Sequence, residues 1–248
     1  MNNIPLIDSW IAKGAKLESD HDKIQFASAM EFFNKIDFSG IGRIADVGSG
    51  PGHQSFYMQQ RGMDVVCIDY VKPVYDNLTH MHPDSDTLGL FDAVWSHHCL
   101  EHIPDPIGAL MNWRSLLKPG GRLFLTVPEI GIVMSPGHIN SFNLPLLMYQ
   151  LAIAGFDCST RQFTKSRSHL RASVLPAVNY DPNVEGREYS LNKLADKKLF
   201  PDSVVKSIRD TGRFSVRDMH LDWYGEKQHP KALTLEAYDF IINNFWGK

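Results

Sequence analysis

The stretch Asp46-Val47-Gly48-Ser49-Gly50-Pro51-Gly52 decides the fold, because it joins a run of strand-forming residues to a helical run. Ile44 to Val47 predicts a buried strand, and Gln54 to Gln60 predicts a helix. Glycines at such a turn let the backbone approach a ligand closely, and the N-terminus of the following helix offers unpaired N–H groups. The stretch therefore predicts a loop that binds a nucleotide-type cofactor.

The spacing of these glycines argues against a dinucleotide. An NAD fingerprint reads G-x-G-x-x-G, whereas here the third glycine comes one residue early and His53 stands at the last position. An acid follows at Asp69, 19 residues beyond Gly50 and at the end of the strand-like run Val65 to Asp69. A carboxylate at that point accepts hydrogen bonds from the hydroxyls of an adenosine ribose. We therefore expect an adenosine ligand with an unphosphorylated ribose.

Outward from this loop, short apolar runs alternate with helical stretches as far as Val174, which is typical of an α/β fold with a doubly wound, mostly parallel sheet. Further strands are predicted at 91–95 and 122–127, and 156–174 alternates like a strand pair. Helices are predicted at 23–36, 106–117 and 145–154. We expect a core over 1–175, including the N-terminal helix, and a C-terminal extension over 176–248 that packs on it.

The second crossover is short. Only 22 residues separate Asp69 from Asp92, whereas a complete strand–helix–strand unit takes about 30 or more. The sequence therefore predicts that the second crossover helix is missing.

Composition excludes several classes of protein. The chain has 248 residues, 43% of them hydrophobic, and a formal net charge of −3, so it has no global field for nucleic acid or anionic membranes. No apolar run reaches the roughly 20 residues of a membrane helix, and Met1 to Lys16 lacks the layout of a signal peptide. We expect a cytoplasmic protein. Its three cysteines, Cys67, Cys99 and Cys158, have no paired spacing and are expected to be reduced and buried.

Four motifs in order resemble the class I S-adenosylmethionine-dependent methyltransferases. They are the glycine loop, the acid Asp69, the segment Phe91 to His102 and the segment Leu116 to Leu123, and together they cover about a third of the chain. The resemblance implies a Rossmann-like methyltransferase fold, a methyltransferase activity and S-adenosylmethionine as cofactor.

The resemblance also implies roles for individual residues. Asp46 and the backbone of the glycine loop would hold the methionine end of the cofactor, and Asp69 would hold its ribose. Tyr70 would lie beside the adenine. The third strand of the family usually has an acid or a loop that frames the adenine, and the closest candidate is Asp76 in Val74 to Leu78. Ser96 and His97 would line the sulfonium. The complete expected cofactor site is Asp46, Gly48, Ser49, Gly50, Gly52, Asp69, Tyr70, Asp76, Ser96 and His97.

Three histidines are candidate catalytic residues. His98 and His102 follow the predicted strand at 91–95, and His138 follows the strand at 122–127, so all three belong to the edge of the sheet where ligands bind. Histidine titrates near neutral pH and can act as a general base or orient a substrate. Alternatively, His102 only orients a loop, and His97 lines the cofactor while His98 points elsewhere.

A divalent metal bound by these histidines and Glu101 is a further alternative. His97 and His98 lack i, i+4 spacing, and no cluster of carboxylates accompanies them, so we expect no metal. The segment Arg161 to Arg171 carries four basic residues and no acid. It is interpreted either as the site of a phosphate or carboxylate on the substrate or as a solvated hairpin edge.

The acceptor is expected to be a small molecule. The Asn/Asp-Pro-Pro-aromatic motif of DNA aminomethyltransferases is replaced by Ser96 to Cys99, so nucleic acid is not expected. Residues 137–158 resemble bacterial and phage methyltransferases of surface-glycan biosynthesis, which implies a hydroxyl of a sugar or phosphosugar. Alternatives are a carboxylate, amine or quinone-type acceptor, or a catalytically silent domain that binds the cofactor. The sequence does not indicate an oligomeric state.

Overall fold

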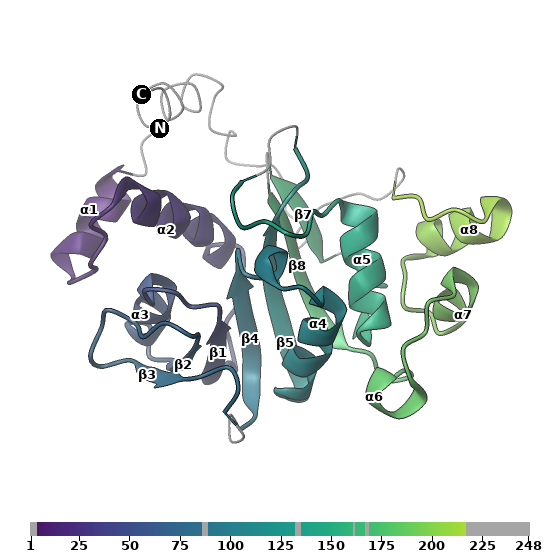
Figure 1. Ribbon diagram of the computed structural model, residues 1–248, viewed down its shortest axis with the longest axis horizontal. Coiled ribbons are helices and arrows are strands. Elements are labelled where there is room, and N and C mark those ends of the chain that lie inside the picture. Colours follow the sequence, from purple (N-terminus) through teal and green to yellow (C-terminus); the bar gives the residue numbers. More distant parts are fainter. Residues whose placement is uncertain (1–3, 86–88, 132–134, 161, 167–168, 217–248) are drawn as a thin grey trace.

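The computed structural model describes residues 4–85, 89–131, 135–160, 162–166 and 169–216. Its centre is an eight-stranded sheet in the order β3-β2-β1-β4-β5-β8-β6, with β7 paired to β8 (Figure 1). Strands β1 to β5 are parallel, whereas β8 is antiparallel to β5, β6 and β7. The strands are β1 (Arg43–Val47), β2 (Asp64–Ile68), β3 (Thr79–Met81), β4 (Phe91–His97), β5 (Leu117–Pro128), β6 (Phe156–Asp157), β7 (Phe163–Ser166) and β8 (His169–Pro176).

Helices cover both faces of this sheet, which makes the fold doubly wound as expected. On one side lie α1 (Ile4–Ala12), α2 (Asp20–Phe33) and α3 (His53–Gln59), and on the other α4 (Pro106–Ser115) and α5 (Leu144–Ile153) (Figure 1). Successive side chains of a strand point to opposite faces of the sheet and join two different hydrophobic clusters. Trp95 packs with Phe33 of α2, whereas Val94 belongs to the cluster of α4 and α5. The Trp95 and Phe33 rings stack with centroids 4.2 Å apart.

Local sequence explains where the helices begin. Ser19 accepts a hydrogen bond from the Asp22 backbone N–H and the Asp22 side chain bonds back to Ser19, which is a capping box for α2. Asp105 and Asn143 cap α4 and α5 in the same way, each with a proline in the first turn that needs no N–H partner. These caps lie immediately before the periodic apolar runs that predicted the helices.

The second crossover has no helix, as the sequence predicts. Residues 69–78 connect β2 to β3 without one. The third strand is shifted, however: Val74 to Leu78 runs beside α3, and the strand is Thr79–Met81. Tyr75 explains the shift, because its ring is buried and stacks on Phe56 of α3 at 4.5 Å. Within the described ranges no helix is long and apolar enough to cross a membrane.

The described part of the C-terminal extension forms α6 (Pro182–Glu185), α7 (Leu191–Asp196) and α8 (Asp202–Thr211). Leu194 of α7 and Val204 of α8 belong to the hydrophobic cluster that also contains α4 and α5. Residues 217–248, including the apolar run at 240–245, lie outside the described residues. The segment 176–216 therefore packs on the core, whereas the boundary at 175/176 stays a prediction.

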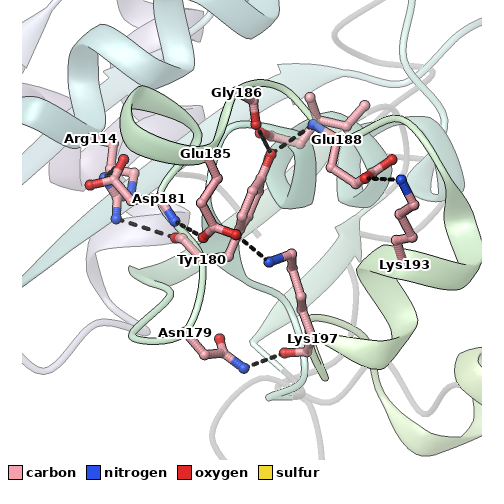
Figure 2. Close-up of polar contacts among 10 residues, drawn as sticks. Arg114, Asn179, Tyr180, Asp181, Glu185, Gly186, Glu188, Lys193 and Lys197 are labelled. Carbon is pink, nitrogen blue, oxygen red and sulfur yellow. Dashed lines mark hydrogen bonds and ion pairs between the residues drawn. The ribbon is translucent and has the colours of Figure 1, made fainter.

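Polar contacts organise this extension around a buried tyrosine, and an ion pair attaches it to α4 (Figure 2). The Tyr180 hydroxyl donates to the Gly186 carbonyl at 3.0 Å and accepts from the Glu188 backbone N–H at 2.8 Å. Arg114 of α4 forms an ion pair with Asp181 at 3.0 Å. Tyr180 itself is only 2% exposed, so its hydroxyl depends on these partners.

Replacement of Tyr180 by phenylalanine tests this attachment. Tyr180→Phe removes the hydroxyl and leaves the Glu188 N–H without its partner, so we expect the free energy of unfolding to fall by about 1–2 kcal/mol in urea titrations. Tyr70→Phe is the control, because Tyr70 is 71% exposed. Equal stability of the two variants would show that the Tyr180 contacts do not hold the extension.

Candidate functional site

The glycine loop lies at the carboxyl edge of the sheet, between β1 and α3. Gly48, Gly50 and Gly52 have φ values of 75°, 51° and 82°, which L side chains rarely adopt. A Cβ on Gly48 would lie 2.4 Å from the Cys99 sulfur, and one on Gly52 would lie 2.7 Å from the Pro73 Cβ. The glycines are therefore required by backbone conformation and, at these two positions, by close packing.

Asp46 is the last polar residue of β1 and is almost completely buried, at 2% exposure. Its carboxylate accepts a hydrogen bond from the Ser55 hydroxyl at 2.5 Å, and Ser55 in turn accepts one from the Cys67 thiol at 3.1 Å. Burial raises the pKa of Asp46 to about 7, against the opposing effect of the Ser55 hydrogen bond and with a further contribution from the charge of Asp69. Ser55 is a partner that the sequence did not reveal.

Asp69 connects the two strand ends that frame the loop. One carboxylate oxygen accepts the Gly50 backbone N–H at 2.8 Å, and the other accepts the Val71 N–H at 3.0 Å. Each oxygen has a second lone pair that can accept a ribose hydroxyl. Tyr70, the next residue, is largely exposed, and its ring meets His82 edge-on at 4.9 Å.

The expected placement of Asp76 in the third strand is wrong, whereas its expected contact with the adenine stays a prediction. Asp76 is exposed and precedes β3, and its neighbour Asn77 exchanges hydrogen bonds with Gln59 at the last residue of α3. It therefore lies in the connection before β3, next to a residue that contacts the last residue of α3. The residues that follow β3 at the carboxyl edge are His82 and Asp84, whose side chains are 3.4 Å apart. The error came from placing the third strand five residues too early.

Ser96 and His97 end β4 and are both buried. The His97 ring is parallel to that of Trp95, with centroids 6.2 Å apart, and neither of its nitrogens has a hydrogen-bond partner among the described residues. Burial, followed by the charges of His98, His169 and Arg171, holds the pKa of His97 well below its usual value. His97 is consequently a neutral imidazole at physiological pH.

His98 lies against His97, with ring centroids 4.6 Å apart, and also contacts a buried acid. It has a φ of 56°, a left-handed conformation, and its Nδ1 lies 3.1 Å from Oε1 of Glu101. Glu101 has no exposed surface, and its Oε2 has no partner in the part of the chain that the structure describes. The two rings therefore stay in contact, and His98 is the one that is bonded to Glu101. Which of them faces the cofactor stays a prediction.

His102 and His138 are brought together although 35 residues lie between them. Their rings meet edge-on with centroids 4.9 Å apart. The loop that carries His138 lies against His102, whose Nδ1 is 2.8 Å from the Gly137 carbonyl oxygen. Partial burial lowers the pKa of His138, Glu101 opposes this shift, and the charges of His102 and His98 lower the pKa slightly further.

Of the basic segment, the structure describes Lys165 and Arg171, and these two do not share a surface. Arg171 is fully buried and bonds Glu31 and the Ser28 carbonyl of α2, at 3.1 and 3.2 Å. Lys165 pairs with Glu129 at 2.7 Å. Two of the four basic residues, Arg161 and Arg167, lie outside the described residues. His169, which the sequence did not single out, contacts His98 edge-on at 4.9 Å, and burial lowers its pKa to about 3.

Comparison with known proteins agrees with this geometry. A family model described as a methyltransferase domain matches residues 16–159, more than half of the chain. Relatives include ubiquinone biosynthesis O-methyltransferases of Xanthomonas axonopodis pv. citri (strain 306) and Xanthomonas oryzae pv. oryzae (strain PXO99A). The first is 29% identical over 54% of this chain and the second 28% identical over 58%. The chain spans 57% and 60% of their lengths.

Solved structures share the fold. The 1,6-didemethyltoxoflavin-N1-methyltransferase of Burkholderia thailandensis, with bound 1,6-didemethyltoxoflavin and S-adenosylhomocysteine, aligns at a TM-score of 0.50 and 20% identity. The alignment covers 69% of this chain and 87% of that one. The PH0226 protein of Pyrococcus horikoshii aligns at a TM-score of 0.53 and 14% identity, covering 65% and 94%. The chain belongs to the class I S-adenosylmethionine-dependent methyltransferase family.

The buried Asp46 predicts a specific dependence of stability on pH. Its pKa of about 7 in the folded chain exceeds the 3.8 of the free side chain, so the folded state binds the proton more tightly. Between these values the free energy of unfolding should fall as pH rises, by up to about 4 kcal/mol relative to Asp46→Asn. Urea titrations of both proteins from pH 4 to 8, without cofactor, measure the difference. Parallel stability curves would contradict the burial of an ionisable Asp46.

Proposed function

We propose that this protein transfers a methyl group from S-adenosylmethionine to a hydroxyl of a small molecule. The observation that carries the proposal is the hydrogen bond between Gly50 and Asp69, which fixes the glycine loop beside an acid with free lone pairs at the carboxyl edge of the sheet. Family membership supports the same conclusion. Structural relatives with bound S-adenosylhomocysteine have the same fold.

The cofactor site combines the loop with the ends of β2 and β4. In the proposal, the Asp69 carboxylate accepts the ribose hydroxyls and Tyr70 lies against the adenine. Backbone groups of Gly48, Ser49, Gly50 and Gly52 and the side chain of Asp46 hold the methionine end. Ser96 and His97 lie nearest the sulfonium, and the neutral state of His97 avoids repulsion of the positive sulfur. Asp76 is left out because of its position.

The acceptor lies on the histidine side of the same edge. Methyl transfer requires the acceptor oxygen in line with the carbon–sulfur bond, so the main task of the protein is to hold that oxygen in place. His98, His102 and His138 follow β4 and β5 and surround Glu101, and we assign them the binding and orientation of the acceptor hydroxyl. His97, behind them, faces the cofactor.

A small-molecule hydroxyl is favoured over other acceptors. The curated relatives are named O-methyltransferases of ubiquinone biosynthesis, which supports oxygen on a ring as the nucleophile. The sugar or phosphosugar hydroxyl suggested by residues 137–158 stays a prediction without support from these relatives. The formal net charge of −3 does not favour a nucleic acid as the methyl acceptor.

A methylation assay tests the reaction. The purified chain is incubated with S-adenosylmethionine labelled in the methyl group and with catechols, hydroquinones, sugars or sugar phosphates, and products are identified by mass. We expect label in an O-methyl group of one class and stoichiometric release of S-adenosylhomocysteine. Cofactor binding without label in any class would favour the silent binding domain, and product on nitrogen or carboxylate would contradict the hydroxyl.

Removal of the ribose acid should weaken cofactor binding selectively. Asp69→Ala loses charge-assisted hydrogen bonds, so we expect S-adenosylhomocysteine to bind more weakly by about 1.5–3 kcal/mol in calorimetric titrations. Asp76→Ala is the matched control, since it removes an exposed carboxylate seven residues away that the proposed cofactor site does not use. The ribose assignment is wrong if both variants bind like the unmodified chain.

A further inference from the structure

One carboxylate and two imidazoles converge at the carboxyl edge of the sheet. Glu101, His102 and His138 each offer one ligand atom, and these atoms all lie within 4.8 Å of one another. Glu101 and His102 belong to the 3₁₀ turn Leu100–His102 after β4, and His138 comes from the loop after β5. We propose that these three residues bind one divalent transition-metal ion.

The buried carboxylate needs a partner that the described protein does not supply. Glu101 has no exposed surface, and although Oε1 contacts His98, Oε2 has no hydrogen-bond partner among the described residues. A buried carboxylate oxygen left in this state is costly, because burial removes its hydration without replacement. A cation beside Oε2 removes this cost. His98 then acts as the outer partner that fixes the orientation of the carboxylate.

A hydrogen bond orients the His102 ring as it would be in a metal site. Its Nδ1 lies 2.8 Å from the Gly137 carbonyl oxygen, which can only accept, so Nδ1 carries a proton. In the neutral ring, Nε2 then has the lone pair that a metal ligand needs. Ligating histidines commonly donate their other N–H to a backbone carbonyl, and that hydrogen bond sets both the tautomer and the ring orientation.

Backbone hydrogen bonds hold the third ligand in place. The Glu101 carbonyl accepts the N–H groups of both Ile139 and Asn140, each at 3.0 Å, and the Asn140 side chain donates to the Ile103 carbonyl at 2.6 Å. His138 immediately precedes these residues. The loop is thus tied to the same turn that carries Glu101 and His102, so the three ligands are arranged before any ion binds.

The ligand set selects the class of ion. Two imidazole nitrogens and one carboxylate oxygen suit Zn²⁺, Mn²⁺, Fe²⁺ or Co²⁺, whereas Mg²⁺ and Ca²⁺ prefer oxygen ligands alone. Three protein ligands also leave coordination positions open. The expectation of no metal relied on close sequence spacing, and it could not include His138, which is 36 residues beyond His102.

The role of the ion rests on the proposed function. An ion with open positions can bind the acceptor oxygen, hold it near the sulfonium and make its hydroxyl more acidic. His102 and His138 then orient the acceptor through the ion. Binding of the ion itself requires no acceptor, so it can be measured separately from methyl transfer.

Cobalt binding tests the site directly. The full chain is treated with chelator and titrated with Co²⁺, whose visible absorption reports nitrogen and oxygen coordination, and Zn²⁺ binding is measured by calorimetry. We expect one ion per chain, and affinity weakened by roughly tenfold or more in each of Glu101→Gln, His102→Gln and His138→Gln. His21→Gln and His82→Gln are controls; His82 forms the exposed pair with Asp84 and reports adventitious binding.

The outcomes separate the possibilities. Absence of stoichiometric binding, or binding unchanged in His102→Gln and His138→Gln, would overturn the proposal; these two side chains are more exposed than Glu101, so the test holds even if Glu101→Gln does not fold. Loss of metal binding in His82→Gln alone would also overturn the proposal, because it would place the ion at the exposed His82–Asp84 pair. S-adenosylhomocysteine is also titrated into the same samples. If it does not bind while the metal ion does, the proposed function is contradicted and the metal site is still supported.

Discussion

The hydrogen bond from the Gly50 N–H to the Asp69 carboxylate is the contact on which the site depends. It joins the turn after β1 to the end of β2, and a second bond, from the Gly48 N–H to the Ile68 carbonyl, lies beside it. Together they hold the glycine backbone open at the edge of the sheet and keep the acid next to it. Because the same carboxylate is proposed to receive the ribose, one residue both builds the loop and binds the ligand.

Several ionisable side chains near this contact are buried, and burial disfavours their charged forms. Asp46 has a pKa raised to about 7 by burial, His97 is neutral for the same reason, and Glu101 has an oxygen without a partner in the described part of the chain. Such groups reduce stability unless a ligand or ion satisfies them. Their concentration along one edge of the sheet is therefore a physical sign of function, and it divides the edge into a cofactor side and an acceptor side.

Most of the fold could be predicted because its signals are local. The glycine loop, the strands before and after it, and the capped helices α4 and α5 depend on residues close together in the sequence. The errors have a common cause, which is contact between distant residues. Tyr75 packs on α3 and moves the third strand beyond Asp76, and the ring of His138 reaches His102 only because backbone bonds to Glu101 fold its loop back. Ser55 beside Asp46 is a different case, because it lies only nine residues further on and its hydroxyl has no distinctive sequence signal.

Native mass spectrometry of the unmodified chain tests the central claim most directly, because it identifies the ligand by its mass. The chain is mixed with equal concentrations of S-adenosylhomocysteine and NAD, and the mass of the bound species is read. We predict a one-to-one complex with S-adenosylhomocysteine and none with NAD. A complex with NAD alone would contradict the assignment of the loop and of Asp69, and the proposals for the acceptor side would lose their basis.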